Sequence, residues 1–228
     1  MGPSFRLSMN WLHTWAGVAI GALLFAIFWM GTLSVFDREI DRWMMPQTRL
    51  AAPAAPVSLD ALRPQVEAAA AGARQWGATL PTDRVPTVQV FWRDAAGATH
   101  RRDADPATAD VLPDAGTLGG TGFIFPFHFH LHITWQRVGY WIVGLAGMAM
   151  LALIVSGVVI HARIFRDFFL LRTGRKAQRT ALDLHNVSGV LGLPFHFVIT
   201  LSGLVIFFSI YFAPSANTAF GGDRAAAA

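Results

Sequence analysis

Histidine is the residue type whose placement in this sequence points most directly to chemistry. Six of the eight histidines lie inside, or at the ends of, segments apolar enough to span a membrane: His13, His128, His132, His161, His185 and His196. Ionisable side chains are costly in hydrocarbon, so those found there usually face a bundle interior and serve a function. Histidine is also the commonest protein ligand of haem iron and other metals. The pattern predicts a b-type haem protein that transfers electrons.

The composition sets limits on the kind of protein and of metal site. The chain has 228 residues, of which 54% are apolar and only 14% are charged, as in a membrane protein. Cysteine is absent, which excludes disulfides, thiolate metal sites, iron–sulfur clusters and covalently attached c-type haem. Any haem must therefore be held by non-covalent ligands. The basic charge, almost entirely arginine, falls in loops and does not indicate nucleic-acid binding.

Three segments are long and apolar enough to cross a lipid bilayer. The first, Thr14 to Phe36, has 23 uncharged residues, and as a helix it would cover about 34 Å against roughly 30 Å for a bilayer core. It is too long for the apolar part of a signal peptide and no A-x-A cleavage site follows it, so we expect a retained helix. The other two cover residues 138–162 and 184–212. We therefore expect an α-helical membrane protein with three transmembrane helices.

The charges in the loops predict the orientation. The loop at residues 163–183 is strongly basic, with Arg163, Arg166, Arg172, Arg175, Lys176 and Arg179. The positive-inside rule places such a loop in the cytoplasm. The N-terminal part of residues 1–36 is then cytoplasmic, and residues 37–137 and the tail at 213–228 are periplasmic.

The long region at 37–137 has the pattern of a small α+β module. Residues Ser58 to Trp76 read as a helix capped by Ser58. Alternating apolar residues from Val85 to Arg93 predict a strand, Asp94 to Gly97 a turn, and Thr99 to Asp103 a return strand. The region has no nucleophile elbow, P-loop or catalytic carboxylate pair, and we interpret His100 as a surface residue.

The third span carries two histidines on a face rich in glycine. His185 and His196 are eleven residues apart, which places them on one side of a helix, about 16 Å apart along its axis. Gly189, Gly192 and Gly203 lie on the same stripe, where a flat porphyrin could approach. Close helix packing also favours small residues, but it explains the glycines and not the histidines.

Three histidines are expected at the cytoplasmic face. His13 is followed by Gly17 and Gly21 at steps of four, and His161 lies one turn after Gly157. Together with His185 they could hold one iron from opposite sides. We favour His13 over His161 as the partner of His185, because its neighbouring glycines open that face of the helix.

The run from Phe127 to His132 places three histidines at the periplasmic face. In a helix His128 and His132 would share a face and His130 would point away, whereas in a strand all three would share one. This cluster predicts an outer haem site, with a zinc or copper site or no ligand role as alternatives.

These segments resemble the PepSY-associated transmembrane family of bacterial inner-membrane proteins. The resemblance rests on Leu12-His-Thr-Trp-Ala-Gly17, Phe36-Asp-Arg-Glu-Ile40, Phe127-His-Phe-His-Leu-His132, Ser156-Gly-Val-Val-Ile-His161, Leu182-Asp-Leu-His-Asn186 and Leu193-Pro-Phe-His196. It implies that the α+β module is a PepSY domain, and that the chain is similar to di-haem reductases of ferric siderophores. Electrons would pass from a cytoplasmic reductant or quinol, through b haems, to a ferric siderophore in the periplasm.

The chain departs from the family pattern at its C-terminal end. The family usually has four helices, whereas this sequence ends at Gly221 to Ala228, after three. We therefore expect the first part of a longer protein or a shortened member, holding one or two haems, with His196 as a substitute outer ligand. A PepSY-type sensor of periplasmic peptides and a zinc- or copper-handling protein are the alternative functions.

Overall fold

The computed structural model describes residues 3–53, 56–73, 75–161 and 176–211. These form two compact units, which are considered separately: a helical unit from residues 1–29 and 128–228, and an insertion unit from residues 30–127. Most of the predicted basic loop and the whole predicted periplasmic tail lie outside the described residues.

The helical unit contains three long apolar helices, α1 (Pro3–Ser34), α5 (Val138–Ile160) and α7 (Ala177–Ile206), followed by the short α8 (Phe208–Tyr211). All three are long and apolar enough to cross a membrane, which confirms the predicted number of spans. A helix satisfies its own backbone hydrogen bonds, and this is the main requirement of a segment inside lipid. The first helix begins before the apolar run, with proline as its first residue, where no intrahelical N–H bond is lost.

Small residues let the helices of this unit approach one another. Leu24 and Ile27 of α1 and Ala146 of α5 are buried together. At Gly147 of α5 an added Cβ would lie 3.3 Å from the Leu204 side chain, and at Gly144 it would lie 2.6 Å from the ring of Tyr211. Glycine is therefore required for the contact of α5 with α7 and α8, as is common between membrane helices.

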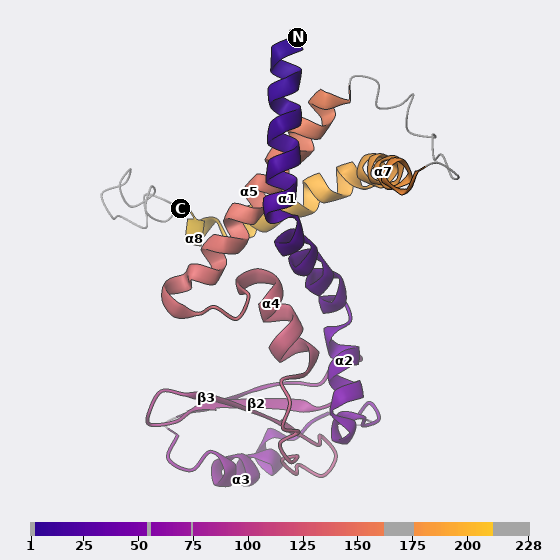
Figure 1. Ribbon diagram of the computed structural model, residues 1–228. Helices are drawn as coiled ribbons and strands as arrows, with labels where there is room; N and C mark the ends of the chain where they lie inside the picture. Colours follow the sequence, from indigo (N-terminus) through magenta and orange to yellow (C-terminus); the bar gives the residue numbers. More distant parts are fainter. Residues whose placement is uncertain (1–2, 54–55, 74, 162–175, 212–228) are drawn as a thin grey trace. The chain divides into compact units, whose positions relative to one another are not determined.

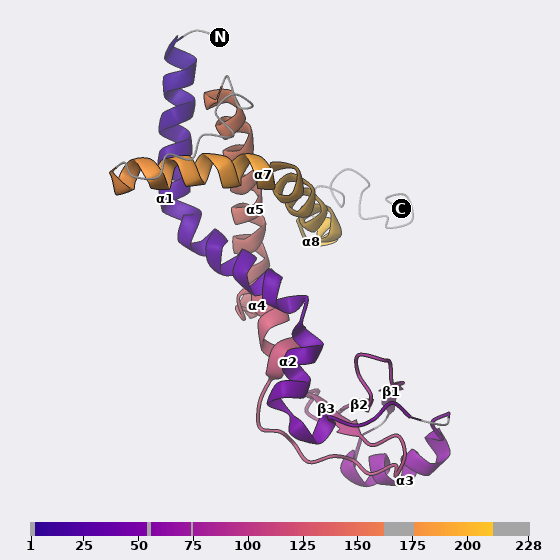
Figure 2. The same cartoon turned by 90° about the vertical axis from the view of Figure 1, so that its right-hand side faces the viewer.

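The helix α7 changes direction part-way along its length (Figure 2). It contains Pro194, which cannot donate a backbone hydrogen bond and whose ring displaces the preceding turn. The proline therefore accounts for a bend in this span.

The insertion unit is a three-stranded antiparallel sheet with one helix on its face (Figure 1). Its strands are β1 (Trp76–Thr79), β2 (Val88–Arg93) and β3 (Thr99–Ala104), in the order β1-β2-β3, and its helix is α3 (Leu59–Ala69). Leu62 and Val66 of α3 pack against Val88 and Val90 of β2 in a single apolar core. This confirms the predicted α+β module between the first and second spans.

The predicted helix from Ser58 to Trp76 is correct at its start and wrong at its end. The Ser58 hydroxyl accepts a hydrogen bond from the Ala61 amide, as expected of an N-cap. The helix ends at Ala69, Gly72 takes a left-handed conformation with φ of 84°, and Trp76 begins β1 opposite Trp92. An alanine-rich run has high helix propensity whether or not the helix continues, so the sequence concealed this end.

The predicted hairpin is confirmed. Strands β2 and β3 pair from Val88 with Ala104 to Arg93 with Thr99, and Gly97 in the connecting turn has a φ of 84°. His100 on β3 stacks on Trp92, and its Nε2 donates to the Asp94 carboxylate at 2.8 Å. This hydrogen bond lowers the pKa of Asp94. His100 therefore stabilises the hairpin and is only partly exposed.

The helix α2 (Asp37–Met44) and the following 3₁₀ turn (Pro46–Thr48) belong to the same unit. Arg84, from the loop between β1 and β2, donates to the Glu39 carboxylate at 2.7 Å and to the Val35 carbonyl at 2.9 Å. Asp41 accepts from the Thr121 amide at 3.1 Å, next to a π-helical turn (Gly120–Ile124) that leads into α4 (Phe125–His130). A further 3₁₀ turn (Trp135–Arg137) precedes α5.

We predict that Leu62→Ala destabilises the insertion unit by about 2–5 kcal/mol, because it removes a buried side chain and leaves a cavity. Leu62 is 1% exposed, whereas Leu59 on the same helix is 46% exposed. Hydrogen exchange of the β2 and β3 amides in the full chain should therefore accelerate in Leu62→Ala and not in the control Leu59→Ala. Equal protection in both variants would contradict this account of the core.

The contact of Glu39 with Arg84 predicts a dependence of stability on pH. The hydrogen bond from Arg84 lowers the pKa of Glu39 from 4.5 to about 2. Stabilisation by this pair is thus present in full above the unfolded pKa near 4.5 and is lost as the pH falls through about 2. The difference in unfolding midpoint between the wild-type chain and Glu39→Gln should shrink over this range. When Arg84 is first replaced by glutamine, Glu39→Gln should change the unfolding midpoint by the same amount at every pH in this range.

Candidate functional site

The structure brings together the two histidines predicted to share one iron. His13 of α1 and His185 of α7 have ring centroids 6.2 Å apart, with their planes at 68°. Two imidazoles on opposite sides of one metal would have centroids roughly 6 Å apart, since each metal–nitrogen bond is about 2 Å long. The spacing of His13 and His185 therefore suits two ligands to a single metal.

The His13 ring has a defined orientation and protonation state. Its Nδ1 lies 3.1 Å from the Leu153 carbonyl and 3.0 Å from the Ser156 hydroxyl, both on α5. A carbonyl oxygen can only accept, so Nδ1 carries the proton and Nε2 presents its lone pair. Histidines that bind metals usually donate their second ring nitrogen to a carbonyl or carboxylate in this way. His13 therefore has the hydrogen bonding of a metal ligand.

The glycines near these histidines have two different roles. An added Cβ at Gly157 of α5 would lie 3.3 Å from the His13 ring, so this glycine makes room for His13. An added Cβ at Gly17, Gly21 or Gly189 would have nothing described within 4 Å. The second group leaves open the faces of α1 and α7 beside the histidines, as a flat cofactor requires.

His161 directly follows α5, and its amide donates to the Gly157 carbonyl at 3.1 Å. The residue before it, Ile160, accepts a hydrogen bond from the Arg6 side chain through its carbonyl. The start of α1 and the end of α5 are thus adjacent. Of the three histidines expected at this end, His13 and His185 are the pair whose rings meet in the described part of the chain.

His196 is held apart from this pair, on the far side of Pro194. Its Nδ1 donates to the Gly192 carbonyl at 2.9 Å, and its ring lies edge-on to Phe28 with centroids 5.4 Å apart. An added Cβ at Gly192 would lie 2.6 Å from this ring. Gly192, predicted to flank a cofactor, therefore accommodates His196 itself. As with His13, the Nε2 lone pair of His196 is left available.

The run from Phe127 to His132 is helical only as far as His130, so neither the fully helical nor the strand arrangement of its three histidines is formed. The helix α4 ends at His130, and Leu131 and His132 have φ of 54° and 57°, in the left-handed region that glycine normally occupies. His128 donates from Nδ1 to the Ile27 carbonyl at 2.8 Å, while His132 is exposed. The helix therefore ends before His132.

His130, which the helical interpretation turned away from the site, is the best-packed histidine of this cluster. Its ring centroid lies 4.7 Å from Phe129, 5.3 Å from Tyr140 and 5.8 Å from His132. Its Nδ1 is buried and has no hydrogen-bond partner among the described residues. No glycine or proline follows His130 to signal the helix end, so sequence reasoning missed this arrangement.

The structure gives no support to a three-histidine zinc or copper site. Across residues 3–53, 56–73, 75–161 and 176–211, no group of three His, Asp or Glu side chains is arranged to hold a metal ion.

Comparison with known proteins identifies the family. The sequence profile described as the PepSY-associated TM region matches residues 10–228. The chain belongs to the PepSY-associated transmembrane family. It is also 37% identical over 79 residues to an uncharacterized protein of Pseudomonas aeruginosa. That match covers 33% of this chain and 20% of the relative, so it spans about a fifth of the relative's length.

Proposed function

We propose that this PepSY-associated protein is a b-type haem protein of the bacterial inner membrane that passes electrons to ferric chelates in the periplasm. The observation that carries the proposal is the pair of His13 and His185, with ring centroids 6.2 Å apart and with Nδ1 of His13 bound to the Leu153 carbonyl. With this spacing the two histidines would serve as ligands of one haem iron.

The residues around the pair suit a haem in three ways. His13 and His185 would hold the iron, and Leu153 and Ser156 would fix the His13 ring and increase its basicity. Gly17, Gly21 and Gly189 would border the macrocycle, because no described atoms occupy the space beside them. When bound, haem supplies one-electron chemistry at a potential set by these ligands and their surroundings.

A second group would be held nearer the periplasm. His128 and His196 both donate Nδ1 to a backbone carbonyl, of Ile27 and Gly192 respectively, and so keep Nε2 for a ligand. Either of them, or the exposed His132, can serve as an outer ligand. This gives the helical unit candidate ligands at two levels of the membrane and a route for electrons between them.

The electron balance requires a donor and an acceptor of stated class. A quinol oxidised to quinone gives up two electrons and two protons and can reduce two ferric ions to ferrous ions, as can a two-electron cytoplasmic reductant. Ferrous iron is the weaker Lewis acid, so an oxygen-donor chelate holds it less tightly. Reduction would thereby release iron from a siderophore.

The proposed orientation places the His13 end of the protein in the cytoplasm. Arg6 contacts the end of α5 at Ile160, so the start of α1 and the end of α5 would lie on the same side of the membrane. Lys176 and Arg179 at the start of α7 add to the positive charge there. Cytoplasmic ends of membrane helices carry such an excess of basic residues.

Substitution of His185 tests the ligand assignment. We predict that the dithionite-reduced minus oxidised spectrum of the purified wild-type chain shows b-type α and Soret bands. His185→Ala should lose the band of the inner haem, whereas His100→Ala, in the insertion unit, should keep the whole spectrum. A flat wild-type trace from haem-replete cells would rule out the redox function, and an unchanged spectrum in His185→Ala would rule out this ligand.

Substitution of glycine distinguishes a cofactor face from a helix-packing face. Gly189 and Gly203 both lie in α7 with open space beside them, but only Gly189 is one turn from His185. Gly189→Leu should reduce the haem content at the inner site, because the leucine would occupy the space of the macrocycle, while Gly203→Leu should retain it. Equal haem content at the inner site in the two variants would show that Gly189 does not border a cofactor.

A further inference from the structure

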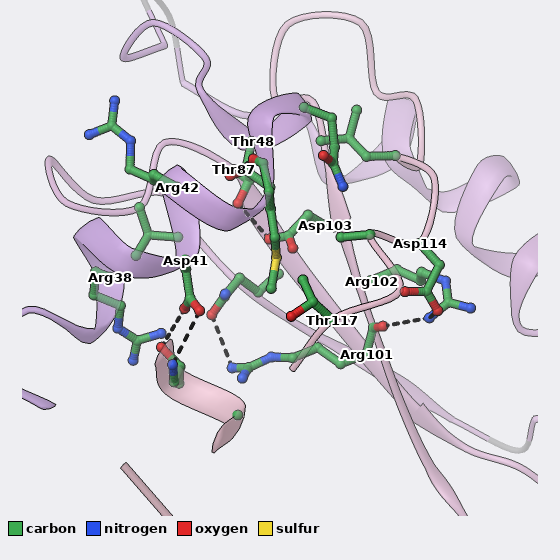
Figure 3. Close-up of a pocket in the computed structure, with 18 of the residues that line it drawn as sticks. Arg38, Asp41, Arg42, Thr48, Thr87, Arg101, Arg102, Asp103, Asp114 and Thr117 are labelled. Atoms are coloured by element: carbon green, nitrogen blue, oxygen red, sulfur yellow. Dashed lines mark hydrogen bonds and ion pairs between the residues drawn. The ribbon is translucent and has the colours of Figure 1, made fainter. Parts of the chain in front are cut away.

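The insertion unit contains a pocket of about 280 Å³ that the proposed electron transfer does not use. Its walls come from α2, from strands β2 and β3, and from the loop before the π-helical turn (Figure 3). Five arginines line it, from separate parts of the chain, and it is called here the arginine pocket: Arg38, Arg42, Arg84, Arg101 and Arg102. Three aspartates also line it, so the wall has an excess of positive charge.

The aspartates of the arginine pocket already have donors. Asp41 accepts from the amide and hydroxyl of Thr121, and Asp103 accepts from the buried Thr87 hydroxyl at 2.6 Å. Asp114 pairs with Arg102 at 2.9 Å. These carboxylates are therefore engaged within the protein and leave little acceptor capacity for a cationic ligand.

Two of the arginines keep unused donors. Arg101 donates to the neutral amide oxygen of Gln89 at 3.0 Å and forms no ion pair among the described residues. One terminal nitrogen of Arg38 is buried and has no partner in the described part of the chain. A guanidinium carries five N–H donors, and its planar geometry matches the two oxygens of a carboxylate. The pocket therefore has unpaired donors and needs a ligand that supplies acceptors.

We propose that the arginine pocket binds the acceptor of the electrons, a compact ferric chelate that is anionic through free carboxylate groups. This inference rests on the proposed function, which supplies the ferric chelate. The pocket volume is close to the lower end of the roughly 300–1,000 Å³ typical of small-molecule sites, so it suits a compact chelate or one carboxylate-bearing arm. Arg101 and Arg38 would bind the carboxylates, and the hydroxyl of Thr117, which accepts from the Gly119 amide, would donate to a remaining oxygen.

Calorimetry with gallium(III) citrate tests the binding separately from the redox reaction. Gallium(III) has the charge of ferric iron and is not reduced under these conditions, so the full-length chain can be titrated whether or not it transfers electrons. We expect saturable binding that weakens about tenfold in Arg101→Gln, which is the loss of one charge-assisted hydrogen bond. Arg63→Gln is the matched control, because Arg63 lies on α3, pairs with Glu67 and does not line the pocket.

The proposal would be overturned by no binding of gallium citrate, by unchanged affinity in Arg101→Gln, or by equal affinity for a neutral gallium hydroxamate chelate. Free citrate that binds as tightly as its gallium complex would also reject the chelate as the ligand. The Arg101 side chain is exposed, so this variant is expected to fold, which hydrogen exchange of β3 will check. Haem content measured on the same samples separates the two proposals. A chain that contains haem but does not bind gallium citrate would reject only the proposed ligand of the arginine pocket. A chain that binds gallium citrate but contains no haem would reject only the proposed electron transfer.

Discussion

The hydrogen bond from His13 to the Leu153 carbonyl is the interaction on which the helical unit's chemistry depends. An imidazole in apolar surroundings needs a partner for each ring nitrogen, because an unpaired polar group there costs free energy. The carbonyl takes the Nδ1 proton and so leaves the Nε2 lone pair as the remaining group to be satisfied. His128 and His196 repeat the arrangement with other carbonyls. Helix backbone thus sets the tautomer of three separate histidines, and each is left with the nitrogen that a metal would bind.

The insertion unit is stabilised in the same way as a small water-soluble domain. Its stability comes from a small apolar core between α3 and the sheet, and several of its charged side chains pair with one another at the surface. Arg84 illustrates the consequence, because it binds Glu39 and the Val35 carbonyl and thereby fixes α2 to the loop between β1 and β2. Arginines that are engaged in this way hold the fold together, whereas Arg101, which donates only to a neutral amide, retains capacity for a ligand.

The features that the sequence predicted well are those carried by long patterns. A span of more than twenty apolar residues, or strict alternation across Val88, Val90 and Trp92, sums many weak preferences into one clear signal. The ends of elements depend on one or two residues and were predicted poorly. Alanines concealed the end of α3 at Ala69, and the left-handed Leu131 and His132 ended α4 without a glycine. The carbonyl partners of the histidines were not predictable at all, since every residue has a carbonyl and only the tertiary structure decides which one a ring will meet.

Glycine shows why helical phase alone was insufficient to define the site. Gly189 and Gly192 lie on the same stripe of α7 and looked equivalent, yet Gly192 is needed because the ring of His196 folds back over it. Gly157 likewise serves a histidine from another helix, His13. By contrast, Gly17, Gly21 and Gly189 have no described atom within 4 Å of the place where a side chain would be. A glycine that makes room for a neighbouring side chain and a glycine that makes room for a cofactor look the same in a sequence. They can be distinguished only when the structure shows what lies beside each one. The open glycines flank the pair of His13 and His185, which is why our proposal places the flat cofactor at that end of the helical unit.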